Sequence, residues 1–453
     1  MARIAFFSIY AFGHTNPTLA VVGELTRRGH RVRYYSFSPF QKAIKAAGGE
    51  FVRCDAYLPP PPPDVDRQVG RDFAGLVEMI TDTTLAMDGP IGRDLREFAP
   101  HCVVSDSLCF WGKLWSAKLG LPYVCSTTTF AFNRETAGMM KQTPGQLLRL
   151  LMGCGRVRRC MERLREEGYP VCGLLDLIQN SNDTDTIVYT SRAFQPKADT
   201  FSSKYAFIGP SIPEQIGAGE RAWEGCCYIS LGTVNNRNLP FYQACIEALR
   251  QESIPVVISV GEQTGLSAFR DVPEHIFLRP RVDQLAVLAQ ASVFVTHCGM
   301  NSASEGLYFG VPLVLYPQQA EQGLVARRVE ELGAGLRLRR ASPEAIRAAV
   351  RQVREQRSYR SRAREIAAGF RDAGGYRRGG GQDFRGGGPG RRGLCGKSSY
   401  AIIQASRPCL KIGNVSNGEE FFRQARRFDA AILCVLQGKS TQYGGKRPAV
   451  WAY

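Results

Sequence analysis

The sequence contains no run of apolar residues that approaches the ~18 needed to cross a membrane, and its N-terminus lacks the long hydrophobic segment and cleavage site of a signal peptide. Its 14 cysteines are scattered, with no Cys-x-x-Cys pair. We therefore interpret them as small buried side chains rather than as a disulfide framework. Only five residues are histidine, which leaves few candidates for a catalytic imidazole. We expect a cytoplasmic protein without a membrane span.

The basic charge of the chain is concentrated at its C-terminal end. The net charge is +17, but residues 371–453 contain 15 Lys and Arg against 5 Asp and Glu and so carry +10 of it. The other 370 residues carry only +7, which argues against nucleic acid as a partner of the main body. The length of 453 residues, with 44% apolar and 22% charged residues, fits a globular protein of two or three domains.

Short apolar runs alternate with helical patterns along most of the chain. A strand over residues 3–9, a turn, a helix over 18–28 and a strand over 30–36 form a βαβ unit, which is typical of a doubly wound parallel sheet. Further strands are predicted over 102–106, 122–126, 186–191, 227–233, 255–260, 276–278, 293–296 and 311–317, and helices over 140–168, 283–290, 322–332 and 342–370. The sequence therefore predicts an α/β fold with two similar halves, 1–208 and 223–378, joined by a linker over 209–222 and facing each other across a cleft.

The segment from Val293 to Glu305 indicates a phosphate site. An apolar strand, 293–296, runs into His297 and Gly299, and Ser302 with Glu305 has the spacing of a capping box that opens a helix. Backbone N–H groups at such a helix start bind anions, and small residues let the phosphate come close. The imidazole of His297 would donate a further hydrogen bond. The alternative is an ordinary strand-to-helix turn whose histidine is satisfied by the protein.

The N-terminal half offers a candidate general base. His14 follows the first strand, in the turn that also contains Gly13, and Asp106 ends a later strand of the same predicted sheet. A carboxylate that holds one nitrogen of an imidazole fixes its tautomer and stabilises the imidazolium. Because no nucleophilic Ser or Cys signature accompanies the pair, the natural proton source is a substrate hydroxyl. The alternative is that each residue merely caps the helix that follows it.

Several strand ends in the C-terminal half carry polar residues. Ser230, Gly232 and Thr233 follow one strand, and segment 280–284, which includes Val282, follows another. Glu321 and Gln322 follow a third, and a carboxylate beside an amide suits the hydroxyl groups of a sugar. The alternative for this last pair is an acidic first turn of a helix.

The order of these motifs resembles that of the family-1, nucleotide-sugar-dependent glycosyltransferases, which have the GT-B fold of two Rossmann-like domains. Residues 297–322, HCGMNSASEGLYFGVPLVLYPQQAEQ, are similar to the donor-binding signature of that family, and GHTNP at 13–17 and SLGT at 230–233 also fit. The resemblance covers roughly residues 3–378 and points to the soluble microbial or plant type. Met300 stands where the plant members often have Trp, so plant-type donor contacts there are in doubt.

This resemblance implies a role for each candidate. His14 would be the general base and Asp106 its partner, while His297 and the backbone amides of Gly299, Asn301 and Ser302 would hold the diphosphate. The remaining donor-site residues would be Glu305 for the ribose hydroxyls, Val282 for the uracil edge, Glu321 and Gln322 for the sugar, and Gly13, Ser230, Gly232 and Thr233 as lining. One displacement by the acceptor oxygen would invert the anomeric carbon. No Asp-x-Asp motif stands beside these residues, so we expect no metal and no other cofactor.

The family pattern stops near residue 378, and segment 379–453 begins with a Gly/Arg-rich run in which we expect no helix. One interpretation is a disordered, RNA-binding tail. The other is a frameshift, because a one-base shift of suitable codons turns Gly-Gly-Gly-Gln-Asp into the Ala-Ala-Asp with which relatives continue. On the second interpretation the tail has no evolved function, and the helix that usually braces the N-terminal domain is missing.

The sequence thus predicts transfer of a hexose from a UDP-sugar to a hydroxyl of a small apolar acceptor, such as a polyketide, macrolide or flavonoid. Segments 56–90 and 126–150 are the expected acceptor contacts, and deoxysugars on dTDP stay open as donors. The alternative function is a catalytically weak nucleotide-sugar-binding or RNA-associated protein that acts through its basic tail.

Overall fold

The computed structural model describes residues 1–58, 72–137, 139, 144–173, 180, 182–233 and 236–380, which all lie in one structural unit, Met1–Arg407. For residues 134, 137, 144–151, 379 and 380 it describes the backbone only. The proline run at 59–63, parts of the expected acceptor segments and the tail beyond 380 lie outside the described residues. Within the described part of the chain, no helix is both long and apolar enough to cross a membrane.

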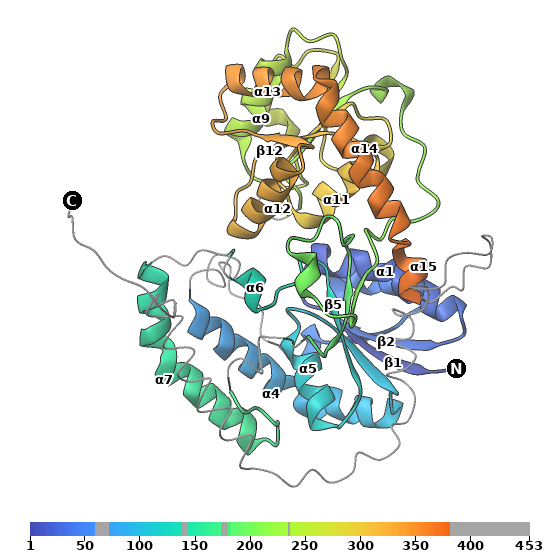
Figure 1. Cartoon of the computed structure of the whole chain (residues 1–453), viewed down its shortest axis with the longest axis vertical. Helices are drawn as coiled ribbons and strands as arrows, with labels where there is room; N and C mark the ends of the chain where they lie inside the picture. The colour runs from blue at the N-terminus through green and yellow to red at the C-terminus, as the bar shows by residue number, and fades with distance from the viewer. Residues whose placement is uncertain are drawn as a thin grey trace, which may run out of the picture. The chain divides into compact units, whose positions relative to one another are not determined.

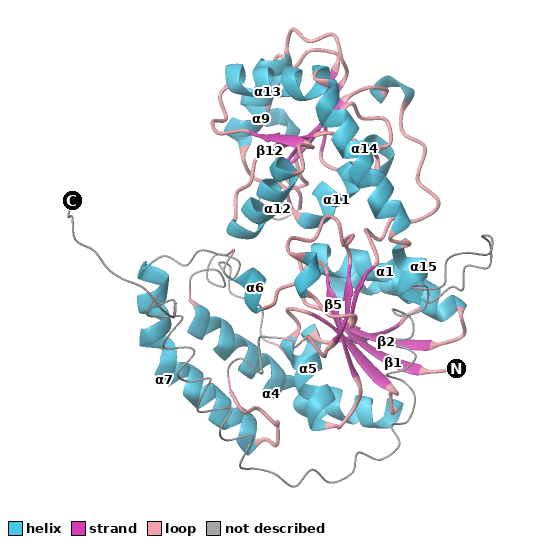
Figure 2. Cartoon of the chain, viewed as in Figure 1, coloured by secondary structure: helices cyan, strands magenta, loops and turns pink. Residues whose placement is uncertain are grey.

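The first half is built on a seven-stranded parallel sheet with the order β3-β2-β1-β4-β5-β6-β7. Its strands are β1 (Arg3–Phe7), β2 (Arg31–Ser36), β3 (Glu50–Arg53), β4 (Cys102–Asp106), β5 (Tyr123–Thr127), β6 (Asp185–Val188) and β7 (Tyr205–Phe207). The helices are α1 (Phe12–Arg27), α2 (Gln41–Ala46), α4 (Phe73–Phe98), α5 (Phe110–Lys118), α6 (Arg134–Ala137) and α7 (Pro144–Glu166). Figure 2 shows these strands as one magenta sheet with helices around it, and α4 packs against α7. Every residue of β4 is buried, as expected for a strand covered on both faces.

The second half repeats this architecture on a six-stranded parallel sheet with the order β10-β9-β8-β11-β12-β13. Its strands are β8 (Cys227–Ser230), β9 (Val256–Ser259), β10 (Ile276–Arg279), β11 (Val293–Thr296), β12 (Leu313–Leu315) and β13 (Gly335–Arg337). The helices are α9 (Leu239–Leu249), α10 (Gln284–Leu288), α11 (Met300–Tyr308), α12 (Ala320–Glu331), α13 (Pro343–Glu355) and α14 (Arg357–Asp372). The predicted fold class of two Rossmann-like α/β halves is confirmed.

Each sheet has one point at which its strand order reverses direction. The chain leaves β1 toward β2 but leaves the neighbouring β4 toward β5, and it leaves β8 toward β9 but the neighbouring β11 toward β12. Right-handed crossovers then place the two following helices on opposite faces, so a crevice opens at the carboxyl ends of both strands. The pairs β1/β4 and β8/β11 are therefore the expected positions of a ligand site.

The first helix begins earlier than the sequence predicts. The predicted start is Thr18, whereas α1 begins at Phe12 and contains Pro17 as its sixth residue. Proline costs least near a helix start; as the sixth residue, Pro17 leaves the carbonyl of Gly13 without the N–H that residue i+4 of a helix normally donates. His14 consequently lies in the first turn of α1 and not in a loop before it.

Three helices, α4, α5 and α9, are absent from the prediction, and α4 covers residues 73–90 of the segment 56–90 that was expected to be an acceptor loop. The remaining differences concern short elements and one helix break. The predicted helix over 342–370 is two helices, α13 and α14, separated at Gln356 by an extended backbone. The short strands β3, β7 and β13 are absent from the prediction, because three or four residues give too little periodicity to read.

The two halves meet around α12 and α14. Arg328 of α12 donates from Nε to the carbonyl of Phe194 at 2.9 Å and from Nη2 to that of Ala193 at 2.8 Å. The ring of Phe194 lies 5.7 Å from that of Phe130 and 5.3 Å from that of Phe370, so an aromatic group from the first half packs against α14 of the second. This junction is formed by residues that follow β5 and β6, at the same end of the first sheet as His14.

A short last helix, α15 (Gly375–Gly380), packs against α1. Figure 1 shows it, in orange-red, beside the blue α1. Tyr376 packs against the core of the first half, and Arg377 pairs with Glu214. The expectation that no helix forms from 379 onward is therefore wrong for residues 379 and 380. Contact with α1 outweighs the low helix propensity of glycine here. The frameshift interpretation, under which the bracing helix is missing, concerns residues beyond 380, which lie outside the described part of the chain.

We expect Tyr376→Ala to lower the free energy of unfolding by about 1–2 kcal/mol, because the half-buried ring loses apolar contacts with the core. Urea unfolding followed by circular dichroism measures the loss. Tyr57→Ala is the matched control, since Tyr57 is 45% exposed and should cost little. Equal effects at the two positions would show that α15 does not brace α1.

Candidate functional site

Both reversal points carry the polar side chains that the sequence singles out. At the first, His14 follows β1 and Asp106 ends β4. At the second, Ser230 ends β8 and His297 follows β11. The sheet order thus brings residues 92 positions apart into contact in the first half, and the βαβ topology accounts for the pairing.

His14 is held on one nitrogen by two side chains. Its Nδ1 lies 2.9 Å from Oδ2 of Asp106 and 3.0 Å from Oγ1 of Thr128. The other carboxylate oxygen of Asp106 accepts the backbone N–H of Leu108 at 2.9 Å, so the carboxylate cannot rotate freely. Because a carboxylate only accepts, Nδ1 must carry the proton, and the lone pair of Nε2 is available to take another.

The surroundings of His14 favour its protonated form. Burial lowers the pKa of His14, but the charge and hydrogen bond of Asp106 and the charge of Glu321 outweigh it, and the net pKa lies above the ordinary value of 6.5. The imidazolium that forms on accepting a proton is therefore stabilised where it stands. Asp106 accepts the backbone N–H of Leu108 in the turn before α5, as the capping alternative proposes, and the same carboxylate gives His14 the geometry that a general base requires.

Glu321 and Gln322 lie in the first turn of α12, as the structural alternative proposes, but they differ in what they do there. Gln322 is buried, and its Oε1 accepts the backbone N–H groups of Gln318 and Gln319 at 2.8 and 3.1 Å. That oxygen serves the capping box of α12 and is not offered to a ligand. Glu321 is exposed, and partial desolvation by the surrounding protein raises its pKa, with His14 lowering it and Asp106 raising it.

His297 lies between two glycines that leave room for its ring. A Cβ on Gly232 would come within 2.6 Å of its Cε1, and a Cβ on Gly299 within 2.6 Å of its Nε2. Burial lowers the pKa of His297 to about 4, so the ring is neutral near pH 7. Its Nδ1 is buried without a hydrogen-bond partner among the described residues. A hydrogen bond to the backbone of Ser230 acts against this lowering of the pKa, and a neutral imidazole keeps one N–H group that can donate to a phosphate oxygen.

The predicted capping box at the start of α11 is wrong. The helix begins at Met300 with Gly299 as its cap, and no side chain caps it. Glu305 instead accepts a hydrogen bond from Nε2 of Gln284 at 2.5 Å, and Ser302 lies 3.4 Å from the same nitrogen. Burial raises the pKa of Glu305 to about 7, although the bond from Gln284 opposes it. The first N–H groups of α11 are left without a capping side chain, as an anion site requires.

The other predicted donor residues follow strand ends of the second sheet, and their burial and contacts differ. Ser230 is buried, and its Oγ accepts the N–H of Gly232 at 3.2 Å, while Thr233 is exposed. Val282 packs against the apolar cluster that contains Met300. Asn301 donates from Nδ2 to the carbonyl of Gly13 in the first half at 2.7 Å. This bond brings the two predicted sites together.

Two residues lie within segments that the sequence analysis names, 126–150 and 280–284, but their contacts at the site were not predicted. Thr128 follows β5 and contacts His14, and Gln284 follows β10 and contacts Glu305. The only available signal was that both come after predicted strands. Among the described residues, no three His, Cys, Asp or Glu side chains gather as metal ligands would.

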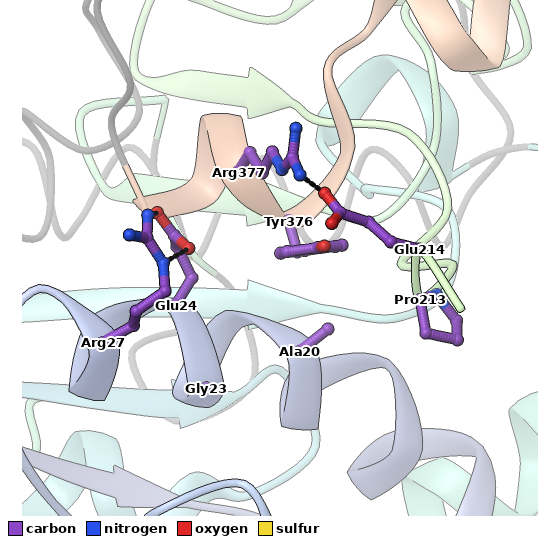
Figure 3. Close-up of a pocket in the computed structure, with 8 residues that line it drawn as sticks. All are labelled: Ala20, Gly23, Glu24, Arg27, Pro213, Glu214, Tyr376 and Arg377. Atoms are coloured by element: carbon purple, nitrogen blue, oxygen red, sulfur yellow. Dashed lines mark hydrogen bonds and ion pairs between the residues drawn. The ribbon is translucent and has the colours of Figure 1, made fainter.

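A pocket of about 520 Å³ lies along α1 at a different place. Figure 3 shows it between the Ala20–Arg27 side of α1, residues 213–214 and α15. Its charged groups pair with one another, Glu24 with Arg27 and Glu214 with Arg377. Its lining residues and the predicted base and donor residues are different sets, so we do not place the substrate there.

Comparison with known proteins shows which proteins the chain is similar to. Residues 245–371 match the family described as "Erythromycin biosynthesis protein CIII-like, C-terminal domain". The chain is 32% identical over 395 residues to the uncharacterized UDP-glucosyltransferase YojK of Bacillus subtilis, covering 83% of this chain and 96% of that protein. It is 27% identical over 393 residues to the oleandomycin glycosyltransferase of Streptomyces antibioticus, covering 83% and 89%.

A solved structure agrees with these relatives. The glycotransferase of kitacinnamycin matches with a TM-score of 0.74 at 26% identity, over 90% of this chain and 99% of that one. These similarities favour an enzyme over the RNA-associated alternative, whose tail lies outside the described residues.

Cys298 adopts a left-handed backbone, with φ of +66°, where a side chain is strained and glycine is not. We expect Cys298→Gly to be more stable than Cys298→Ala by about 0.5–1 kcal/mol, which reverses the usual order. Cys245, buried within α9, is the matched control, and there Ala should exceed Gly by about 1 kcal/mol. Chemical unfolding of the four variants checks this, and the same order at both positions would contradict it.

The raised pKa of Glu305 predicts a stability that depends on pH. Between the unfolded value near 4.5 and the folded value of about 7, the folded protein binds more protons than the unfolded one, so this contribution falls as pH rises. We expect Glu305→Gln to gain on the order of 2–3 kcal/mol relative to the wild type from pH 4 to pH 8. Urea unfolding at several pH values measures the difference, and parallel curves for the two proteins would refute it.

Proposed function

Because the chain belongs to the macrolide-type glycosyltransferases of family 1, we propose that it transfers a hexose from a UDP-sugar to a hydroxyl of a small apolar acceptor. The observation that carries the proposal is the hydrogen bond from Asn301 to Gly13. It joins the start of α11, which has the features of a diphosphate site, to the helix turn that contains His14. A base and a leaving-group site on opposite sides of one crevice suit a single displacement.

In the proposed reaction, Nε2 of His14 takes the proton of the acceptor hydroxyl as its oxygen attacks the anomeric carbon. Asp106, at 2.9 Å from Nδ1, stabilises the imidazolium, and Thr128 keeps the ring in place. The bond from the anomeric carbon to the diphosphate oxygen breaks on the opposite face, which inverts the configuration. We assign the leaving diphosphate to His297 and to the uncapped N–H groups of α11, without a metal ion.

The donor would extend along the second crevice. Its ribose hydroxyls would donate to Glu305, which Gln284 orients, and its uracil would lie beside Val282. Its sugar would contact Glu321 and the amide nitrogen of Gln322, since the oxygen of Gln322 caps α12. Ser230, Gly232 and Thr233 would line the phosphate end. Relatives such as the oleandomycin glycosyltransferase support a macrolide or polyketide as the acceptor.

We expect His14→Ala to reduce transfer by about 10²–10⁴-fold, the usual contribution of a general base, while UDP binds with nearly unchanged affinity. Product formation is followed by mass spectrometry and UDP binding by titration calorimetry. His275→Ala is the matched control, because His275 contacts the carbonyl of Leu249, outside the crevice. Transfer that survives in His14→Ala would reject His14 as the base.

A screen of donors against acceptors identifies the substrates. UDP-glucose and dTDP-deoxysugars are each combined with macrolides, polyketides and flavonoids, and glycosides are detected by mass. We expect UDP-glucose to be the better donor. Transfer from dTDP-sugars alone would reject the UDP assignment while leaving the reaction class intact.

A further inference from the structure

Asn301 makes a contact that its proposed place in a diphosphate site does not require. Its Nδ2 donates to the carbonyl of Gly13 at 2.7 Å, across 288 residues of sequence. It comes from the second residue of α11 and reaches the second residue of α1. The bond thus joins the first turns of the two helices that follow the reversal-point strands β1 and β11.

The acceptor of this bond is open because of a proline. In an α-helix the carbonyl of residue i accepts the N–H of residue i+4, and for Gly13 that residue is Pro17, which has no N–H. The carbonyl is therefore left for an outside donor, and Asn301 provides one. Proline in the sixth position of α1 and asparagine in the second of α11 are complementary features of one contact.

The contact stands next to the proposed base. Gly13 precedes His14, whose ring is held by Asp106 from β4 and by Thr128 from the segment after β5. All three belong to the first half. Glu321, from α12 of the second half, acts on His14 through its charge. The distance from His14 to Glu321 and to the start of α11 therefore depends on how firmly the two halves are joined at this point.

The other joining contacts lie away from the turn of His14: α15 packs along the Ala20–Arg27 side of α1, and Arg327 donates from Nη2 to the carbonyl of Met139 at 3.3 Å. Arg328 binds the carbonyls of Ala193 and Phe194, and Phe194 packs on Phe370. They act on the segment after β6, whereas the bond from Asn301 acts on the turn of His14 itself.

We propose that Asn301 is a positioning residue. Its hydrogen bond to the carbonyl that Pro17 leaves open joins α11 to α1 and so fixes the position of His14 relative to the donor. The inference rests on the proposed glycosyl transfer and assigns to the side chain of Asn301 a role other than diphosphate binding. If it instead bound the diphosphate, its removal would weaken UDP binding and leave His14 unaffected.

The test compares Asn301→Ala with the wild type under saturating donor. We expect kcat to fall about 3- to 10-fold, as for the loss of one hydrogen bond, with the dissociation constant of UDP unchanged within about twofold. His14 works as a base only when deprotonated, so activity rises as pH rises through its pKa. Asp106 and Glu321 are the charged groups that raise this pKa. Loss of the bond from Asn301 lets Glu321 move away from His14 and so weakens its effect on the pKa. The acid limb, which is the low-pH part of the kcat/KM profile where activity rises with pH, should therefore move to lower pH.

Two further variants sharpen the result. Glu321→Gln should move the acid limb to lower pH in the wild type. The shift should be smaller in the Asn301→Ala protein, because the bond from Asn301 keeps Glu321 near His14. Asn238→Ala is the matched control: it deletes the same amide from the cap of α9, where Asn238 accepts the N–H of Phe241 at 3.2 Å, and should leave the limb in place.

The inference is overturned if Asn301→Ala keeps the wild-type kcat and acid limb, or if its main effect is a loss of UDP affinity. A wild-type protein that transfers no sugar from any donor would instead reject the proposed function. The two failures are therefore distinguishable in the same set of measurements.

Discussion

The reversal of strand order in each sheet is the constraint on which the site depends. A parallel sheet buries both faces and leaves only its strand ends for chemistry. At β1/β4 and β8/β11 the following helices diverge, so side chains such as His14 and His297 reach a crevice without breaking the core. Two sheets of this kind bring the proposed base, His14, and the proposed diphosphate site at the start of α11 to one junction, through the bond from Asn301 to Gly13. Neither half alone contains both.

Much of this was readable from the sequence, because the signals are local. Alternating strands and helices give the two halves, and the residues at strand ends give His14, Asp106 and His297. The glycines at 232 and 299 are understood only in the structure, where each leaves the space that the ring of His297 occupies. The family resemblance supplied roles for residues such as Glu305 and Glu321 that spacing alone leaves open.

What the sequence could not supply depends on contacts between distant segments. Ser302 and Glu305 have the spacing of a capping box, yet Gln284 competes for both side chains, and competition from another strand end leaves no local pattern. Thr128 is one of many threonines until β5 is placed beside β4. The early start of α1 was hidden because Pro17 normally argues against a helix interior. In α15, packing against α1 overrides the poor helix propensity of glycine.

The anchoring of α12 has a consequence for protein engineering. Its first turn carries Glu321, which we propose to contact the sugar, while Arg328 in its last turn is bonded to the backbone of Ala193 and Phe194 in the other half. The position of Glu321, the proposed sugar contact, therefore depends partly on the backbone of the first half, which Arg328 contacts. Chimeras that exchange whole halves between related enzymes to change the sugar would move α12 without the carbonyls of Ala193 and Phe194 that Arg328 contacts. The exchange unit that preserves the donor site includes the segment after β6.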